Sequence, residues 1–280
     1  GLQTCGSVWT CPVCSHKIQE IRRLELAIGL QRLTRSDKPF FDKDGVMHTP
    51  TDYQAVMITF TFPHKHNQKL KYLVKAFSRA LNLLKSGDGF IGFKKKYQYL
   101  GQIRGFEVTH GKNGWHPHTH ELWFVSSSLK RREFKKAIQE RWVYACLTAG
   151  LIEKDTEAFK HFLLHSVDVK FDCELSDYLA KQDNVKHWGI DKEMVKSSGK
   201  GAKGHHPFSL ADEGKSEPWI EYTIAMKEGR VRQLRWSPHL KEMAQIEDIQ
   251  DERAAQIEGD EILSVVGVLN KQNWNSVLKQ

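Results

Sequence analysis

The chain has 280 residues, with 42 lysines and arginines against 34 acids, a formal net charge of +8 and a pI near 9.1. An apolar content of 40% and a charged content of 27% exclude a disordered or collagen-like chain, and this length can bury the core of one large or two modest domains. No run approaches the roughly 18 consecutive apolar residues of a membrane span, and no signal segment opens the chain, so we expect a soluble protein with no membrane partner.

The charge is unevenly distributed along the chain. Residues 242–261 contain eight acids and one arginine, whereas residues 1–241 contain 39 basic and 26 acidic residues. A basic body followed by an acidic stretch favours a polyanionic partner for the body.

The first third of the chain predicts a cysteine-rich knuckle, two helices and a strand. The knuckle occupies residues 1–15, and apolar spacing predicts a helix over 16–36. Residues 55–62 alternate up to Pro63 and predict a strand, and the amphipathic pattern of 70–84 predicts the second helix.

Two strands, 102–109 and 118–125, are predicted to form a hairpin around the turn sequence of residues 111–114. A long basic helix over 129–150 and a strand over 166–171 follow.

The rest of the chain predicts a helix over 174–182, a loop over 197–218 and an alternating, strand-like stretch over 222–236. Helices are expected at 241–258 and 260–278.

Strands and helices mix without a regular β-α-β alternation, so we predict an α+β fold with an antiparallel sheet flanked by helices. The predicted domains are a knuckle with its helix (1–38), a central domain (45–240) and a helical tail (241–280).

The hairpin carries a candidate metal site. His118 and His120 are two apart on a strand, so their side chains share one face and can bind the same ion. If paired residues sum to 225 or 227, Glu107 lies on that face as the third ligand, whereas a slip of one residue would turn it away. The alternative is a surface strand with a histidine-rich edge.

The predicted helix over 174–182 aligns Glu174, Tyr178 and Lys181 on one face, at i, i+4 and i+7. Together they can supply a base, a nucleophile and a charge at a phosphate, although a solvated helix face has the same spacing. Tyr222 also has an acid beside it and a lysine five residues on, but its alternating stretch favours a structural role.

Cys5, Cys11 and Cys14 resemble part of a structural zinc site, because thiolates two residues apart can chelate one ion. The fourth ligand is expected to be His16 or, in preference, a cysteine upstream of Gly1. A redox Cys-x-x-Cys pair is the alternative, but no thioredoxin-like β-α-β pattern surrounds it.

Cationic runs on both sides of the hairpin are candidates for DNA binding, with an aromatic residue between them for base stacking. These residues are Lys94, Lys95, Lys96, Trp115, Lys130, Arg131 and Arg132. Each run could equally be a solvated face.

Three motifs in this order resemble those of the HUH endonucleases, and more narrowly the plasmid rolling-circle replication initiators with a single catalytic tyrosine. They are Thr-Phe-Thr at 59–61, Gly-Trp-His-Pro-His-Thr-His at 114–120 and Tyr-Leu-Ala-Lys at 178–181. The segments 5–14 and 233–237 also look like that plasmid group. One departure is Thr119, where the family usually has a bulky hydrophobic residue.

The resemblance implies an HUH/RRM-like nicking domain that requires Mg²⁺ or Mn²⁺, in a bacterial cytoplasm. Tyr178 would attack single-stranded origin DNA, becoming linked to the 5′ end and leaving a 3′ hydroxyl for a polymerase. Lys181 would stabilise the phenolate or the phosphate, and Glu174 would activate water at termination. A host helicase and polymerase are the implied protein partners.

Three alternatives stay open. A single-tyrosine transposase or a relaxase would keep the chemistry but change the biology. A cupin-type metalloenzyme would need many short regular strands instead of long helices. A non-catalytic zinc-dependent DNA-binding protein would keep its activity when Tyr178 is replaced by phenylalanine.

Overall fold

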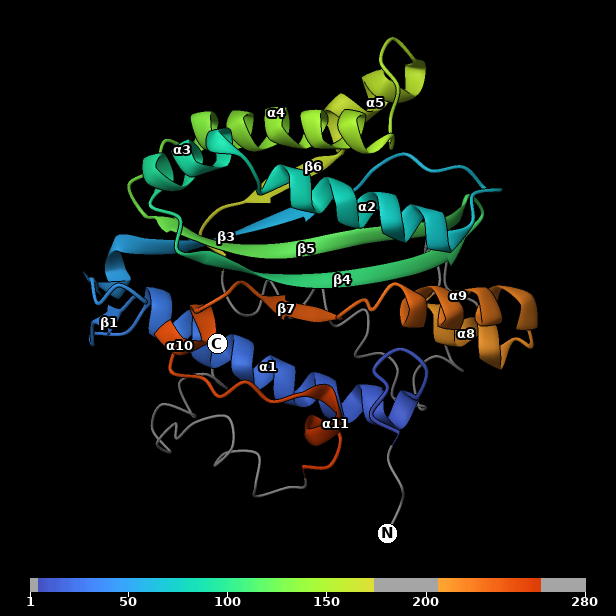
Figure 1. Cartoon of the computed structure of the whole chain (residues 1–280), viewed down its shortest axis with the longest axis horizontal. Helices are drawn as coiled ribbons and strands as arrows, with labels where there is room; N and C mark the ends of the chain where they lie inside the picture. The colour runs from blue at the N-terminus through green and yellow to red at the C-terminus, as the bar shows by residue number, and fades with distance from the viewer. Residues whose placement is uncertain (1–4, 174–205, 258–280) are drawn as a thin grey trace. The chain divides into compact units, whose positions relative to one another are not determined.

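A computed structural model describes residues 5–173 and 206–257 of the chain (Figure 1). The chain divides into two units, and each joins segments that are distant in sequence. Among the described residues, the first unit comprises 5–55, 172–173 and 236–257, and the second comprises 56–171 and 206–235. The predicted helices over 174–182 and 260–278 lie outside the described residues.

A five-stranded sheet, mostly within the second unit, has the strand order β6-β3-β5-β4-β7. Its strands are β3 (Tyr53–Phe60), β4 (Gly101–Gly111), β5 (Gly114–Ser126), β6 (Val167–Lys170) and β7 (Leu234–Trp236). β3 pairs antiparallel with β6, and β4 pairs antiparallel with β5. The predicted α+β fold with an antiparallel sheet and flanking helices is confirmed.

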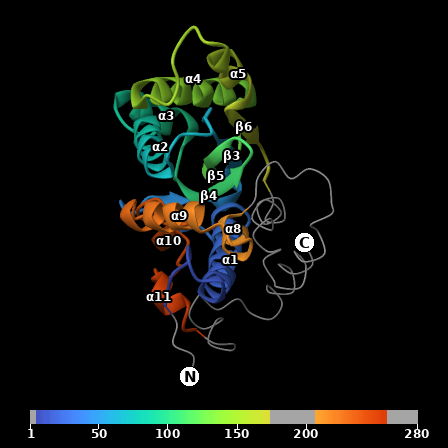
Figure 2. The ribbon, with the colours of Figure 1, turned by 90° about the vertical axis from the view of Figure 1, so that its right-hand side faces the viewer.

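Three helices of the second unit, α2, α3 and α4, cover one face of this sheet (Figures 1 and 2). They are α2 (Leu70–Leu84), α3 (Asp88–Tyr97) and α4 (Arg131–Ala149), and α5 (Glu157–His165) follows them. Phe60 on β3 packs against Trp123 on β5 and Trp142 on α4, with ring centroids 6.3 and 4.9 Å away. These buried aromatic rings form the core between the sheet and the helices.

The first unit is built on one long helix. It contains α1 (Pro12–Thr34), a hairpin of β1 (Phe40–Phe41) and β2 (Met47–His48), and the short helices α10 (Leu240–Met243) and α11 (Asp251–Ala254). Within residues 5–173 and 206–257, no helix is long and apolar enough to cross a membrane.

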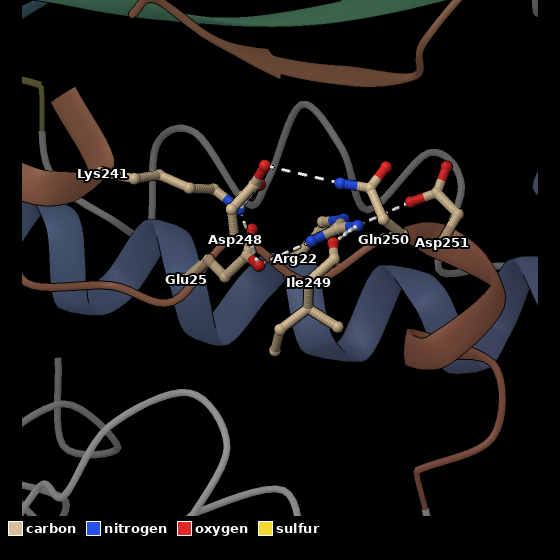
Figure 3. A network of polar contacts seen from close by, with 7 residues as sticks. All are labelled: Arg22, Glu25, Lys241, Asp248, Ile249, Gln250 and Asp251. Atoms are coloured by element: carbon tan, nitrogen blue, oxygen red, sulfur yellow. Dashed lines mark hydrogen bonds and ion pairs between the residues drawn. The ribbon is translucent and has the colours of Figure 1, made fainter. Parts of the chain in front are cut away.

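Arginines of α1 hold the segment that contains α10 and α11. Arg32 donates hydrogen bonds to the carbonyl oxygens of Ala244 and Gln245. Arg22 donates to the carbonyl oxygen of Ile249 and to the carboxylate of Asp251 (Figure 3).

The prediction of one continuous acidic helix over 241–258 is therefore wrong. A continuous helix would give those carbonyl oxygens to amides four residues later, but here the arginines occupy them. Gln245 also takes a left-handed conformation with φ 52°, which ends the first short helix.

A buried carboxylate joins the two sides of this contact. Glu25 has no exposed side-chain surface, and its Oε1 accepts from Arg22 (2.5 Å) and from Lys241 (3.1 Å). Lys241 also pairs with Asp248, at 2.9 Å (Figure 3). The acidic stretch thus has specific cationic partners within its own unit.

The prediction of a strand beginning at Tyr222 is also wrong, because Tyr222 lies in α9 (Ser216–Glu228). The buried residues of α9 are Tyr222, Ala225 and Met226, which follow helical spacing. Ile224 is exposed on the other side, and this outward apolar residue creates the apparent alternation of 222, 224 and 226. The end of the predicted loop over 197–218 forms α8 (Pro207–Asp212) and the start of α9.

Candidate metal centre

The β4–β5 hairpin brings the three predicted metal ligands to one face of the sheet. Glu107 is directly opposite His118 in the register, and Gly105 is opposite His120. The turn depends on Gly114, whose φ is +80° and whose position leaves no room for a Cβ, since that atom would lie 2.8 Å from the carbonyl oxygen of His66. Glycine at position 114 therefore allows the turn of the hairpin to approach the backbone of His66 closely.

The ligand atoms of these three side chains converge. Glu107 Oε2 lies 3.1 Å from His118 Nε2 and 3.8 Å from His120 Nε2, and all three atoms lie within 4.8 Å of one another. The side chains are 19%, 15% and 11% exposed, respectively. Two imidazole nitrogens and one carboxylate oxygen are a donor set that suits a divalent first-row metal, and a three-ligand set leaves positions for substrate.

The carboxylate of the set is held in its charged form. Burial opposes the charge on Glu107, but a hydrogen bond from His118 and the nearby His118, His120 and His206 together hold its pKa below the usual value. An ionised carboxylate at neutral pH is the form that binds a cation.

Two further histidines border the set. Burial and the nearby His118 and His64 lower the pKa of His116 to about 3, so its imidazole is neutral at physiological pH. The ring of His64 lies 4.8 Å from that of His116, and His64 Nδ1 lies 3.0 Å from the carbonyl oxygen of Asn113.

The sequence gives no sign that His206 belongs to these surroundings. It precedes α8, almost a hundred residues after Glu107. Burial lowers its pKa to about 4, against an opposing electrostatic interaction with Glu107. Only the tertiary fold brings its imidazole near this carboxylate.

The predicted cationic runs gather at one place on the helices. Glu133 on α4 pairs with Lys96 at the end of α3 (3.1 Å) and with Lys130 at the start of α4 (3.5 Å). This cationic cluster consists of Lys94, Lys95, Lys96, Lys130, Arg131 and Arg132. α3 and α4 cover the sheet face to which Phe60 points, whereas Thr59 and the candidate metal ligand His120 lie on the opposite face, so the cluster does not border the candidate metal centre (Figure 1).

Trp115 is not the exposed stacking surface that its place in sequence suggested. Its side chain is only 3% exposed, and its ring stacks on that of Tyr222 with centroids 6.1 Å apart. His110 packs against its edge. This packing anchors α9 to the hairpin and leaves the cationic side chains as the candidates for DNA contact.

The predicted catalytic residues Tyr178, Glu174 and Lys181 lie outside the described residues. Their rival, Tyr222, is 1% exposed, and burial raises the pKa of its phenol well above the usual value. A buried phenol with a raised pKa is a poor nucleophile, which agrees with a structural role for Tyr222.

A second group of side chains that could hold a metal ion lies at the start of α1. The sulfur atoms of Cys5, Cys11 and Cys14 lie within 4.8 Å of one another, and all three are free thiols. Burial opposes ionisation of Cys11, but hydrogen bonds from Cys14 and its neighbours lower the pKa of this thiol. Three thiols in this arrangement suit zinc. His16 is exposed on α1 and is not part of the group.

The chain is similar to known replication proteins. A family model described as "Replication protein" matches residues 2–146. Protein rep of Streptomyces lividans is 25% identical over an alignment of 354 residues, which covers 100% of this chain and 73% of the relative. A neomycin resistance protein of Streptomyces cyanogenus is 26% identical over 163 residues, which cover 49% of this chain and 34% of that relative. No solved structure matches.

Proposed function

The chain belongs to the replication protein family, whose model matches just over half of its length. From that premise we propose that it is a plasmid rolling-circle initiator of the HUH type, which nicks single-stranded origin DNA and later rejoins or releases it. The observation that carries this proposal is the convergence of Glu107, His118 and His120 on one point. A cation held there could polarise a phosphodiester and offset the charge that develops as the strand is cleaved.

Glu107, His118 and His120 would hold one Mg²⁺ or Mn²⁺ ion. When bound, the ion would polarise the scissile phosphate and offset the charge that develops on it. The phenol oxygen of Tyr178 forms a bond to phosphorus while the bond from phosphorus to the 3′ oxygen breaks. The phenol loses its proton and the 3′ oxygen gains one, which leaves a 5′-phosphotyrosine and a free 3′ hydroxyl.

Two side chains near Tyr178 in sequence would assist. Lys181, three residues after Tyr178, would stabilise the phenolate or the phosphate, since an unperturbed tyrosine with a pKa of about 10 is a poor nucleophile at pH 7. Glu174, four residues before Tyr178, would act as a general base that activates water and releases the enzyme at termination.

The cationic cluster on α3 and α4 would bind the DNA backbone away from the scissile phosphate. It lies on the helical layer, so it would contact flanking DNA and not the nucleotides at the metal centre. Phosphate contacts of this kind add affinity without reading sequence.

Different parts of the chain would have different roles. Residues 45–240 would form the nicking domain, residues 1–38 a zinc-stabilised docking element, and residues 241–280 an acidic tail that does not touch DNA. The free 3′ hydroxyl would serve a polymerase in the bacterial cytoplasm, together with a host helicase.

A covalent adduct tests the proposal. The full chain is incubated with Mn²⁺ and a single-stranded oligonucleotide of the cognate origin, labelled at its 3′ end, and then denatured. Wild type and Tyr222→Phe are expected to carry the label, and Tyr178→Phe is expected to carry none. An adduct that persists in Tyr178→Phe would place the nucleophile elsewhere, and its absence from wild type would remove the proposal.

We also propose that Cys5, Cys11 and Cys14 bind a structural zinc ion. Chain purified in reducing buffer without chelator should contain about one zinc ion by elemental analysis. Cys14→Ser is expected to lose most of it, whereas Cys146→Ser, a buried thiol of α4, should retain it. Equal zinc in both variants would contradict the assignment.

A further inference from the structure

Thr59 on β3 and Thr61 just after its end place their hydroxyls against histidines of β5. They are two residues apart in an extended segment, so their side chains share one face. Phe60 between them points to the opposite face, into the aromatic core beneath α4. β3 lies beside β5 in the sheet, which places this threonine pair next to the histidine-bearing strand.

Thr59 contacts one metal ligand directly. Its Oγ1 lies 2.9 Å from His120 Nδ1. When Nδ1–H donates to this oxygen, the neutral imidazole keeps its lone pair on Nε2. Nε2 is the atom that faces Glu107 Oε2, at 3.8 Å. The contact therefore holds the ring in the orientation that a metal ligand needs, with Nε2 turned toward Glu107.

Thr61 reaches the other histidine ligand through His116. Thr61 Oγ1 lies 2.6 Å from His116 Nε2. The carbonyl oxygen of His116 lies 3.3 Å from His118 Nδ1, which leaves His118 Nε2 facing Glu107 Oε2 at 3.1 Å. Both ligands thus have their Nδ1 atoms partnered away from the site and their Nε2 atoms turned toward it.

We propose that Thr59 and Thr61 are positioning residues that hold His120 and His118 ready to bind a divalent cation. This inference rests on the proposed function, because it assumes that the three side chains bind a cation. It assigns a chemical task to the Thr-Phe-Thr sequence: the two hydroxyls orient the ligands, and the phenylalanine between them anchors the strand. Hydrogen-bond partners of this kind typically change metal affinity by about 10- to 100-fold.

The test is a titration of the full chain with Mn²⁺, followed by electron paramagnetic resonance of the free ion. Thr59→Val keeps the shape of the side chain and removes the hydroxyl, so we expect affinity to fall by about 10- to 100-fold. Thr59→Ser keeps the hydroxyl and should restore most of the affinity. Thr61→Val should have a smaller effect, since it acts through His116.

Two controls separate positioning from general damage. Thr223→Val removes an exposed hydroxyl of α9 that donates to the carbonyl oxygen of Ile220, and should leave Mn²⁺ binding unchanged. Nuclear Overhauser contacts of the metal-free protein should show one fixed orientation of the His120 ring in wild type and additional orientations in Thr59→Val. A general folding defect would affect many residues. Loss of positioning should instead alter the His120 ring alone, and Thr59→Ser should restore it.

The Mn²⁺ titration separates the positioning role of Thr59 and Thr61 from the metal centre itself. If wild type binds Mn²⁺ more tightly than the His118→Ala/His120→Ala variant, but Thr59→Val matches wild type in affinity and in the orientation of the His120 ring, the positioning role is wrong and the metal centre stands. If wild type binds no better than the double variant, both proposals fail.

Discussion

Replacing both His118 and His120 by alanine is expected to slow nicking of the origin strand by at least about 10³-fold. The change removes two of the three ligands, and a bound metal typically contributes several kcal/mol of charge stabilisation, with each 1.36 kcal/mol worth a factor of ten in rate. The measurement is the single-turnover nicking rate at saturating Mn²⁺.

The loss should be specific to the site and not to the fold. Both side chains lie on the face of the sheet opposite the aromatic core of Phe60, Trp123 and Trp142, so the variant should remain folded. A matched control replaces His161 and His165, two exposed neighbouring histidines of α5, and should nick at the wild-type rate. A double variant at the ligands that nicks within tenfold of wild type would show that the centre is not catalytic.

The second large effect concerns stability. Glu121 on β5 is fully buried, and its carboxylate accepts from Lys85 Nζ at 2.9 Å and from Trp123 Nε1 at 2.7 Å. Arg104 lies directly opposite it in the register. We expect Glu121→Ala to destabilise the protein by about 3–5 kcal/mol, because it leaves buried cations without their counter-charge. Urea unfolding of wild type and variant measures the difference.

The ion pair between Lys85 and Glu121 should also make the stability of the protein depend on pH. Burial lowers the pKa of Lys85 to about 8, against the stabilising charge of Glu121. Its unfolded-state pKa is about 10.4, so the unfolded chain binds more protons between these values and stability from this group rises with pH there. Without Glu121 that pKa should fall further, so Glu121→Ala should recover stability as the pH is raised from 7 to 10. Loss of the exposed Glu133 should cost far less, and an equal cost would contradict the role of burial.

The hairpin shows what the sequence could predict. The glycine-bounded turn at residues 111–114 limits the hairpin to a few registers, and in the structure Glu107 lies opposite His118, which is one of the pairings expected. The convergence of the ligands therefore depends on local rules. The partnership of Thr59 with His120 does not, because it requires β3 to lie beside β5, and strand order is a property of the whole fold.

The features that the sequence did not predict correctly have a common physical cause, which is tertiary packing. α9 has an alternating sequence, but a helix buries Tyr222 against Trp115 and leaves Ile224 exposed. That same contact buries the tryptophan that we expected to stack on DNA. The acidic stretch after Leu240 has helical spacing, but Arg22 and Arg32 take its carbonyl oxygens. None of these partners is near in sequence.

Glu107, His118 and His120 are proposed to hold the cation at which DNA is cut. Anomalous diffraction from crystals of the full chain soaked in MnCl₂ tests it most directly. We expect a manganese peak within bonding distance of His118 Nε2, His120 Nε2 and a carboxylate oxygen of Glu107. Saturating Mn²⁺ that leaves no peak between these atoms would contradict the account.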